Sequence, residues 1–580
     1  MKSVKSSLKP TRSWQDIDWR LANARLRQLQ LNIVKAYKLK DQTRVRLAQE
    51  QLARSFAARA LSIRAVTSNS GRNTPGIDNV VWDTPLKLHK AIQKLSEISP
   101  ANYKPSPVKR IYIPKPNGEK RPLGIPTMID RSYQTLWNFA ILPIAESTAD
   151  SRSYGFRPYR STKDAVGYTA LLLKSPTMSR RFVLEGDIVK FFDTVSHDWL
   201  IDNIPMNKVV LRKILTAGYV EYGGTVTKTD KGFAQGGTIS PTLANMSLNG
   251  LQDLLEGLDF RMARYADDFV VLGRTSESLE EVAKPKLSEF LEKRGLTLHP
   301  TKSVVTNALQ GFNFLGFTLR LFENPMMTSG YQFHMYPQYS KVIAFCDKLK
   351  AVIKKHINNR GTPDFEALIS ELNPMLRGWS NYYRSSKASL IFKKVGKFVF
   401  ETVWRRLVRF NPEVSKRVLA RKYFKRVGNR GWLLYFTPKN RRVLEVFLYQ
   451  IGDTPSVPHV LIKGEAHPFD ETHDAYLANR AAKTASLNKT VPELKRALAR
   501  EQLGLCLVCN TPLLDESIKT SWYTYESEKV EIHHIKSVKE GGTSGFKDLI
   551  LLHRTCHAQV THSSDPKLIA AWKKLNLISS

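Results

Sequence analysis

Two adjacent aspartates, Asp267 and Asp268, interrupt a run of residues that favours β-structure, RMARYADDFVVL (residues 261–272). Desolvation and mutual repulsion both disfavour neighbouring carboxylates beside a buried strand. A tight turn between two strands would place both acids at the tip of a hairpin, where divalent cations can neutralise them. A lone pair of aspartates is more often an ordinary surface feature, so this pair needs support from other segments.

A third aspartate, Asp187, ends another β-forming run, FVLEGDIVKFF (182–192). Three carboxylates of this kind can hold two Mg²⁺ ions about 3.5–4 Å apart, as in the phosphoryl transfer of polymerases. One ion would activate a primer 3′-hydroxyl, and the other would bind a triphosphate and stabilise the leaving pyrophosphate. The sequence therefore predicts a two-magnesium site at Asp187, Asp267 and Asp268.

Three further segments could serve the same chemistry. VKRIYIPKPNGEKRPLGIP (108–126) carries a Pro-Asn-Gly hairpin signal among basic residues, and it could close over a triphosphate or a template. SRSYGFRPYRS (151–161) alternates Arg with aromatic residues, a composition suited to stacking on bases and contacting phosphates. GFAQGGTISPTLANM (232–246) is a glycine loop before a helix, with Ser240 as the expected N-cap and Pro241 in the first turn. Each segment alone is also compatible with an ordinary surface hairpin, cluster or loop.

The chain is strongly basic, with a formal net charge of +37 over 580 residues. Such a charge repels itself unless a polyanion binds, so nucleic acid is the leading partner and an anionic membrane surface the rival. No apolar run reaches the roughly 18 residues that could span a bilayer. The N-terminus, MKSVKSSLKPTRSW, lacks an apolar signal core. We therefore expect no membrane partner and no secretion.

The texture of the sequence changes along the chain. Residues 14–66 predict two basic helices, with Leu26, Leu29, Ile33 and Tyr37 at helical spacing. From about 70 to 320, short β-branched runs alternate with turns and helices, and 335–430 is helical again. The segment that follows contains WLLYF as an expected strand. The predicted fold class is α+β with several domains.

The C-terminal residues are rich in Cys and His. Cys506 and Cys509 pair naturally with His553 and Cys556 as two knuckles of one tetrahedral structural Zn²⁺ site. The alternatives are a pair of small core cysteines and a core histidine. Between the knuckles, VEIHHIKSVKEGG places two adjacent histidines on an expected strand, where their side chains point to opposite faces. One of them could bind a metal while the other activates a water.

The order of the basic hairpin, the basic-aromatic loop, the Asp187 strand, the QGG loop and the YADD hairpin resembles the reverse transcriptases, especially those encoded by group II introns. Further motifs of that family are NTPGIDNVVW (73–82), LHPTKS (298–303), FNFLGF (312–317) and LRGWSNYYR (376–384), the last resembling the maturase-specific thumb. The resemblance implies a right-hand polymerase with fingers and palm, a helical maturase X thumb, a DNA-binding region and a nuclease module. The implied domains are 1–70, 71–330, 331–430, 431–495 and 496–580.

The resemblance also implies roles for individual residues. Asp187, Asp267 and Asp268 would be the catalytic metal-binding triad, and Phe192 would select dNTPs by blocking a ribonucleotide 2′-hydroxyl. Residues expected to border the nucleotide and template are Gln235, Gly236 and, in the fingers hairpin, Lys109, Arg110 and Arg121. One departure is Tyr159, where relatives often have Gly.

The C-terminal module resembles the HNH nucleases, whose ββα site holds one divalent ion. By that likeness His533 and His557 are metal ligands, and His534 is the general base for attack on a DNA phosphodiester. Asp548 stands where HNH nucleases usually carry Asn, and it is a possible further ligand. His562 would be another ligand or a surface residue. The alternative is a zinc-stabilised DNA-binding module without cleavage.

Together these resemblances imply an RNA-directed DNA polymerase, splicing maturase and site-specific DNA endonuclease that acts in intron mobility. Its partners would be the intron RNA as a lariat ribonucleoprotein, target DNA and dNTPs, in a bacterial cytoplasm or an organellar matrix or stroma. Retroviral, retron and telomerase enzymes are not expected to end in an HNH module. Two alternatives stay open: an RNA-binding cofactor with vestigial catalytic sites, and a reverse transcriptase with another biological role.

Overall fold

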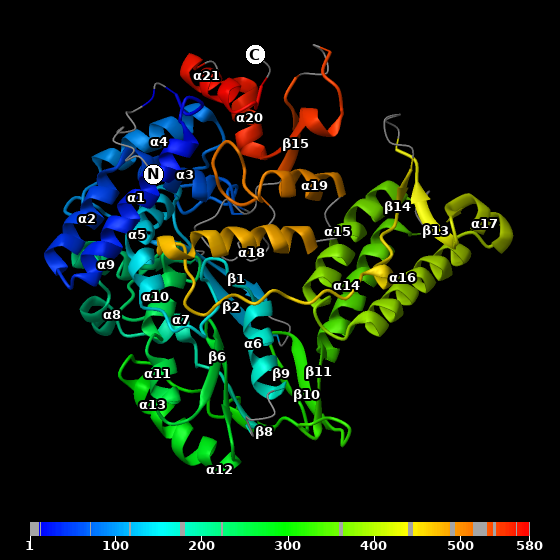
Figure 1. The fold of residues 1–580 in the computed structure, drawn as a ribbon, viewed down its shortest axis with the longest axis horizontal. Helices are drawn as coiled ribbons and strands as arrows, with labels where there is room; N and C mark the ends of the chain where they lie inside the picture. The colour runs from blue at the N-terminus through cyan, green and yellow to red at the C-terminus, as the bar shows by residue number, and fades with distance from the viewer. Residues whose placement is uncertain are drawn as a thin grey trace.

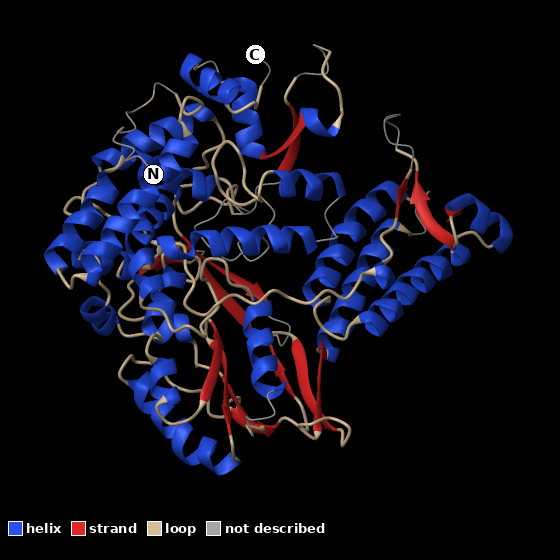
Figure 2. Ribbon diagram, in the orientation of Figure 1, coloured by secondary structure: helices blue, strands red, loops and turns tan. Residues whose placement is uncertain are grey.

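The computed structural model describes residues 11, 13–69, 71–114, 118–174, 180–221, 224–358, 363–438, 445–487, 493–513, 530–536, 541–563 and 565–578. Figure 1 shows a mainly helical N-terminal body, a strand-rich centre and a separate helical lobe that carries the thumb sequence. Figure 2 shows that the strands form several small sheets rather than one continuous layer. This mixture of helices and short sheets agrees with the predicted α+β class.

The N-terminal segment forms three helices where the sequence predicted two: α1 (Trp19–Lys38), α2 (Gln42–Arg54) and α3 (Phe56–Thr67). Asp18 and Asp41 cap the first two by accepting from backbone N–H groups. The apolar stripe of Leu26, Leu29 and Ile33 is buried against helix α5 (Met128–Ser147) within one large core. The remaining helix of this body is α4 (Pro85–Glu97). Packing therefore buries the apolar faces of α1 and α2 and leaves their basic residues exposed or half-buried, whereas Arg64 of α3 is buried.

The predicted basic hairpin is present. Strands β1 (Val108–Pro114) and β2 (Lys120–Ile125) pair antiparallel, from Lys109 opposite Ile125 to Pro114 opposite Lys120. The turn residues 115–117, including Lys115, lie outside the described residues. The sheet has the order β2-β1-β4-β5 and is completed by β4 (Tyr219–Val220) and β5 (Val226–Thr227). This sheet corresponds to the expected fingers.

The central sheet has the order β6-β7-β3-β8 and contains all three aspartates at strand ends. Its strands are β6 (Arg261–Tyr265), β7 (Asp268–Gly273), β3 (Phe182–Gly186) and β8 (Val304–Asn307). The helices of this region are α6 (Thr162–Lys174), α7 (Phe191–Thr194), α8 (His197–Asn203), α9 (Lys208–Leu215), α10 (Ser240–Ser247), α11 (Leu251–Glu256), α12 (Ser276–Ser278), the π-helix Leu279–Ala283 and α13 (Lys284–Glu292). Residues from β3, β6 and β7 are buried against them, which fixes the sheet in place.

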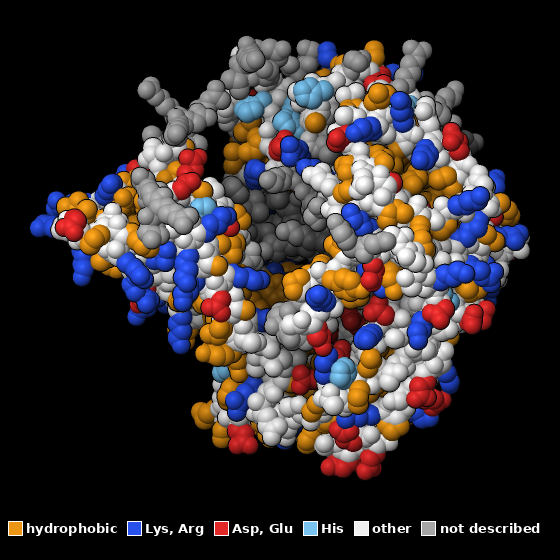
Figure 3. Space-filling model, turned by 180° about the vertical axis from the view of Figure 1, so that it is seen from behind, with side chains coloured by type: hydrophobic (Ala, Val, Ile, Leu, Met, Phe, Trp, Pro, Cys, Tyr) orange, Lys and Arg blue, Asp and Glu red, His pale blue; other side chains and the backbone are white. Residues whose placement is uncertain are grey.

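The thumb sequence is helical, as predicted. A three-stranded sheet of β9 (Phe312–Phe314), β10 (Phe317–Glu323) and β11 (Tyr331–Pro337) precedes α14 (Tyr339–His356), α15 (Phe365–Tyr383), α16 (Ser389–Arg409) and α17 (Lys416–Tyr423). The expected WLLYF strand lies in β13 (Arg430–Phe436), between β12 (Phe424–Val427) and β14 (Val446–Phe447). Figure 3 shows Lys and Arg gathered on this lobe. Exposed cations on α16 and α17 are Lys393, Lys394, Lys397, Arg405, Arg409, Lys416, Arg417, Arg421 and Lys422.

Helices α18 (Asp474–Leu487) and α19 (Glu493–Glu501) follow the thumb in the chain. The C-terminal module then pairs β15 (Val530–His534) antiparallel with β16 (Leu549–His553), and α20 (Arg554–His562) follows directly. Helix α21 (Pro566–Lys574) is near the end of the chain. This arrangement is the ββα unit that the HNH likeness implied.

The basic-aromatic segment 151–161 does not have the exposed arginines that base stacking requires. Arg157 is buried with Glu146, each with about 2% of its side chain exposed, and their charged groups lie 3.0 Å apart. Arg157 also donates to the carbonyls of Asp150 (2.7 Å) and Ser153 (2.8 Å), and Arg160 is buried beside the same carboxylate. Arg157 and Arg160 are therefore structural, and Arg152 is half-buried with its guanidinium 4.2 Å from the ring centroid of Tyr168. The sequence could not show this, because the carboxylate partner comes from helix α5, outside the segment.

Tyr159, the departure from relatives that often carry Gly, has a φ of 61°. That value lies in the left-handed region that glycine adopts without strain. The structure thus gives a backbone reason for glycine at this position.

The buried pair predicts a large effect of Glu146→Gln. Removing one partner leaves the Arg157 charge buried and uncompensated, which costs about 3–5 kcal/mol. Urea unfolding followed by circular dichroism should show the loss. Glu401→Gln, which removes an exposed carboxylate 3.3 Å from Arg405, should cost about 0–1 kcal/mol. Equal unfolding midpoints for the two variants would contradict the buried-pair assignment.

Candidate polymerase site and metal centres

The YADD segment forms the tight hairpin that the sequence predicted. Tyr265 at the end of β6 pairs with Asp268 at the start of β7, which leaves Ala266 and Asp267 as a two-residue turn. Ala266 has a φ of 59°, a conformation that costs a non-glycine residue free energy and is common at functional sites. Asp267 is half-buried and Asp268 is exposed at the tip.

Strand pairing brings the third acid to the same place. Strand β3 pairs antiparallel with β7, and Gly186 is in register with Phe269. Asp187 follows Gly186 and Asp268 precedes Phe269, so the two acids lie beside each other at one edge of the sheet. The three carboxylates predicted to act together are therefore brought together.

The electrostatics of the site show mutual repulsion. Although the side chain of Asp268 reaches solvent, desolvation by the surrounding protein, followed by the charges of Asp267 and Asp187, raises its pKa to about 6. Burial and the charge of Asp187 also raise the pKa of Asp267, while Arg121 acts in the opposite direction on both acids. Clustered oxygen ligands whose pKa values stay raised despite the nearby Arg121 fit divalent cations such as Mg²⁺.

A lysine missed as a site residue contacts the triad. Lys302 Nζ lies 3.1 Å from Asp187 Oδ2. The backbone N–H of His299 donates to the Asp187 carbonyl at 2.7 Å. Both residues belong to the LHPTKS motif. The basic side chain of Lys302 was the only sequence signal for its contact with Asp187.

The basic-aromatic segment supports the catalytic turn from beneath. Tyr154 N–H donates to the Arg264 carbonyl at 2.8 Å, which aligns the segment with β6. Asn245 Nδ2 donates to the Gly155 carbonyl at 2.8 Å, and Arg264 Nη1 donates to the Ala266 carbonyl at 3.3 Å. A Cβ atom at Gly155 would overlap the backbone nitrogen of Ala266. The turn can therefore sit where it does only above a glycine.

The fingers residues divide into packing and electrostatic roles. Arg110 lies with its guanidinium 3.3 Å from the ring centroid of Tyr219, so it packs within the fingers sheet. Lys109 lies on β1 opposite Ile125. Arg121 is exposed on β2, and among the three predicted fingers cations it is the one whose charge acts on both Asp267 and Asp268.

The QGG loop joins the fingers to the palm. The Gln235 carbonyl accepts from Gly124 N–H at 2.7 Å, and Gly236 has a φ of 117° with its α-carbon close against the Gly124 carbonyl. Glycine is therefore required at position 236, because a Cβ atom there would overlap the carbonyl oxygen of Gly124 in β2. The predicted N-cap role of Ser240 is wrong: helix α10 begins at Ser240, whose hydroxyl donates to the Ala234 carbonyl at 2.9 Å.

Phe192 follows Asp187 on the short helix α7 and is half-buried. Its ring packs edge-on against Phe233, with centroids 5.2 Å apart, and its carbonyl accepts from the Phe233 N–H at 2.8 Å. The loop that precedes Gln235 thus fixes the aromatic residue expected to select the sugar.

The C-terminal knuckles come together as predicted. Cys506, Cys509, His553 and Cys556 are buried, and their ligand atoms lie within 4.8 Å of one another. His553 Nε2 lies 3.1 Å from the Pro512 carbonyl, which turns Nδ1 toward Cys509. Burial raises the pKa of Cys506 to about 12 and that of Cys556 well above its usual value, so a bound cation would be needed to hold these two sulfurs as thiolates. Three sulfurs and one imidazole fit Zn²⁺.

The HNH residues are only partly assembled. The rings of His533 and His557 lie 5.1 Å apart, and burial lowers the pKa of His533, which keeps its imidazole neutral. His557 Nδ1 lies 2.7 Å from Glu531, a carboxylate on β15 that the sequence analysis did not select. His534 points elsewhere, with Nε2 3.4 Å from the Ser544 hydroxyl. The opposite orientation of the two adjacent histidines agrees with a strand.

Asp548 and His562 lie apart from this pair. Asp548 accepts a hydrogen bond from the Thr543 hydroxyl, and His562 is exposed at the end of α20. Within the described ranges, Asp548, His533 and His557 do not form a group with ligand atoms within 4.8 Å. The role of Asp548 at the divalent ion stays a prediction.

A second group of possible ligands has a local explanation. The ligand atoms of His467, Asp470 and His473 lie within 4.8 Å of one another. His467 Nδ1 accepts from the Phe469 N–H at 3.3 Å, and Asp470 Oδ1 accepts from the Thr472 N–H at 3.0 Å. Capping of the short helix Glu471–His473 accounts for the grouping.

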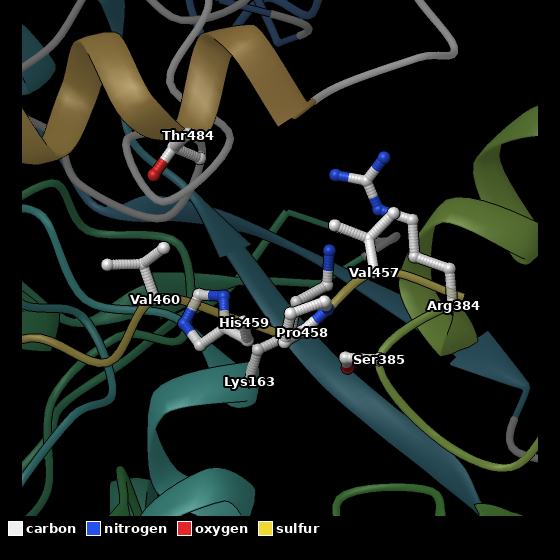
Figure 4. A pocket seen from close by; sticks show the side chains of 8 residues that line it. All are labelled: Lys163, Arg384, Ser385, Val457, Pro458, His459, Val460 and Thr484. Carbon is white, nitrogen blue, oxygen red and sulfur yellow. The ribbon is translucent and has the colours of Figure 1, made fainter. Parts of the chain in front are cut away.

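A small pocket lies where the palm, the thumb and α18 meet (Figure 4). Its charged lining residues are Lys163 at the start of α6 and Arg384 at the end of α15, with His459 beside them. The hydroxyl residues Ser385 and Thr484 complete the polar lining. Cations with hydroxyl groups suit a phosphate, so this pocket is a candidate contact for a nucleic-acid backbone.

Comparison with known families agrees with this geometry. Residues 113–319 match the reverse transcriptase (RNA-dependent DNA polymerase) family, and 14–95 match the N-terminal domain of reverse transcriptase. Residues 346–424 match the group II intron maturase-specific domain, and 506–563 match the HNH endonuclease family.

Individual proteins are also similar to this chain. Protein YkfC of Escherichia coli is 32% identical over 304 residues, which cover 45% of this chain and 79% of that protein. Group II intron-encoded protein LtrA of Lactococcus lactis is 29% identical over 44% of this chain and 53% of its own length. The putative COX1/OXI3 intron 1 protein of Saccharomyces cerevisiae is 22% identical over 84% of this chain and 64% of that protein.

The chain belongs to the family of group II intron-encoded proteins that join a reverse transcriptase, a maturase-specific domain and an HNH endonuclease in one polypeptide. It spans about half the length of the lactococcal relative that it matches. None of the helices in the described part of the chain has the length and apolarity needed to cross a membrane.

The position of Gly155 predicts that Gly155→Ala lowers DNA synthesis without unfolding the protein. The new methyl group displaces the turn that carries Asp267, and a displacement of about 1 Å costs roughly 100-fold in rate. Primer extension on an RNA template measures the effect. Gly431→Ala is the control, since a Cβ there meets nothing within 4 Å. Full activity of Gly155→Ala would contradict the proposed support of the turn.

The raised pKa values predict that Mg²⁺ stabilises the protein more at higher pH. The protonated acids stabilise the metal-free fold at low pH, and this contribution is lost as the pH rises through about 6. Saturating Mg²⁺ should therefore raise the melting temperature more at about pH 7.5 than at about pH 5. The difference should shrink in Asp268→Asn. A Mg²⁺ effect independent of pH in the unmodified protein would argue against the repulsive cluster.

Proposed function

We propose that the chain is a multifunctional enzyme of intron mobility: an RNA-directed DNA polymerase, a splicing maturase and a site-specific DNA endonuclease. The observation that carries the proposal is the convergence of Asp187, Asp267 and Asp268 beside the fingers hairpin. Two bound Mg²⁺ ions would supply activation of the primer 3′-hydroxyl and stabilisation of the leaving pyrophosphate. Arg121 contributes positive charge for the incoming dNTP, and Phe192 restricts the sugar site.

The maturase role is electrostatic. Intron RNA presents an A-form backbone that a protein recognises through phosphates and shape rather than through one catalytic group. The exposed cations of α16 and α17, together with the pocket of Lys163 and Arg384, are the proposed contacts. Their spread over the thumb and the palm–thumb junction suits an extended RNA surface.

The nuclease role rests on the ββα module. His533 and His557 are the proposed ligands of one divalent ion, with Asp548 as a possible third, and His534 is the proposed general base. Cys506, Cys509, His553 and Cys556 are the proposed ligands of structural Zn²⁺. The intron RNA inserts into one DNA strand, the module nicks the other, and the exposed 3′-hydroxyl primes cDNA synthesis. We place this reaction in a bacterial cytoplasm or an organellar matrix or stroma.

Two substitutions separate the activities. Asp267→Ala should abolish cDNA synthesis and leave splicing intact, because it removes a metal ligand without changing the RNA-binding surfaces. His534→Ala should abolish second-strand nicking and leave both other activities intact. Three assays measure these outcomes: primer extension, protein-dependent splicing of the cognate intron, and nicking of labelled target DNA. Loss of splicing in a folded Asp267→Ala protein, or unchanged nicking by His534→Ala, would contradict the assignments.

A non-enzymatic RNA-binding cofactor is the competing function, and the strongly basic composition favours it equally. The unmodified protein decides between them, since a cofactor with vestigial sites extends no primer. Sequencing the RNA that co-purifies with the protein from its native host identifies the RNA partner. One enriched intron lariat supports the maturase role, and a diffuse mixture of RNAs contradicts it.

A further inference from the structure

An arginine from the N-terminal helices reaches into the zinc knuckle of the nuclease module. Arg64 of α3 is about 2% exposed. Its Nη2 donates to the Thr555 hydroxyl at 2.8 Å and to the Cys556 sulfur at 3.3 Å. Its guanidinium also lies 4.6 Å from the ring centroid of Trp19 on α1. A charged group this deeply buried requires compensation from its surroundings.

The donor set of the knuckle supplies that compensation. Zinc bound by three thiolates and one neutral imidazole carries a net charge of −1. A guanidinium that donates to one of the sulfurs balances this charge and strengthens the hydrogen bond. Hydrogen bonds of this kind to metal ligands orient the ligands and increase metal affinity.

Other contacts join the same two parts of the chain. Asn23 Nδ2 donates to the Cys509 carbonyl at 3.2 Å, so a second zinc-ligand residue is contacted from α1. Gln559 Nε2, from α20, donates to the carbonyls of Ile17 (2.6 Å) and Gln15 (3.0 Å). Residues of α1, α3 and the nuclease module share one buried apolar cluster. Figure 1 shows the red helices α20 and α21 beside the blue N-terminal helices.

We propose that Arg64 is a positioning residue of the zinc site, and that the zinc-loaded knuckle is the joint that docks the nuclease module onto the N-terminal helices of the polymerase. A bound Zn²⁺ with three thiolates would carry a net charge of −1, located on the sulfurs, which the guanidinium of Arg64 offsets through its contact with the Cys556 sulfur. Removal of zinc therefore weakens the docking of the nuclease module, and removal of the Arg64 side chain weakens zinc binding.

If the module is the proposed nuclease, this joint also fixes where the module cuts relative to the polymerase site. A nuclease fixed to the polymerase body holds the nicked strand at a constant distance from Asp187, Asp267 and Asp268. The zinc knuckle would thus set the offset between the nick and the primed synthesis. The contacts themselves are independent of whether the module cleaves DNA.

The test compares full-length Arg64→Met, which removes the charge, with Arg59→Met on the same helix. Arg59 donates to the Ala53 carbonyl within the N-terminal body and serves as the matched control. The release of zinc to a chromogenic chelator is measured over time. The zinc ion of interest is the tightly bound one, which is identified because the Cys509→Ser variant does not bind it. We expect Arg64→Met to release it about tenfold faster or more, and Arg59→Met to release it at the unmodified rate.

Hydrogen exchange of backbone amides at and just before the start of α1 measures the docking. The exchange rate of residues 17–23 should rise when zinc is removed from the unmodified protein. It should already be raised in zinc-loaded Arg64→Met. Primer extension by Arg64→Met should be unchanged, which separates this role from a general folding defect. Asn23→Ala, which deletes the contact with the Cys509 carbonyl, repeats the test if Arg64→Met does not fold.

Unchanged zinc release in the folded Arg64→Met protein would overturn the zinc half of the proposal. Faster release without a change in α1 exchange would overturn the docking half. Absence of nicking by the unmodified protein would instead count against the proposed nuclease, because neither zinc release nor hydrogen exchange depends on cleavage.

Discussion

Repulsion among three carboxylates is the constraint on which the polymerase half of this protein depends. Asp187, Asp267 and Asp268 lie at the ends of two neighbouring strands of one sheet, and burial, followed by the charges of the neighbouring acids, raises the pKa values of the two turn acids. The fold keeps them together at a cost in free energy that cations relieve. A rigid support is needed, since an unsupported turn would separate the charges.

That support comes from residues that never contact substrate. Gly155 leaves room beneath the turn, and Arg264 holds the Ala266 carbonyl. The segment that contains Gly155 is anchored in turn by the buried pair of Arg157 and Glu146. A chain of specific contacts therefore connects helix α5 to the catalytic turn, and the strained φ of Ala266 is maintained by its neighbours.

Local signals in the sequence predicted the elements well, and long-range partners were not predictable. The YADD turn and the fingers hairpin follow from alternating β-formers and turn residues, and the Cys/His spacing identified the zinc cluster. The burial of Arg157 was missed because its partner, Glu146, lies on helix α5, outside the segment, and Ser240 was misassigned because the Ala234 carbonyl competes for its hydroxyl. Contacts such as those of Lys302 with Asp187 and Arg64 with Cys556 join distant segments and leave no local pattern.

The central claim, that the three aspartates form one divalent-metal site, is tested most directly by replacing Mg²⁺ with Fe²⁺ and mapping oxidative cuts in the backbone by mass spectrometry. The account predicts palm cuts next to both Asp187 and the Asp267–Asp268 turn, suppressed together by excess Mg²⁺ and lost together in Asp187→Asn. Cuts at the turn that persist unchanged in Asp187→Asn, or no cuts in the palm at all, would contradict it.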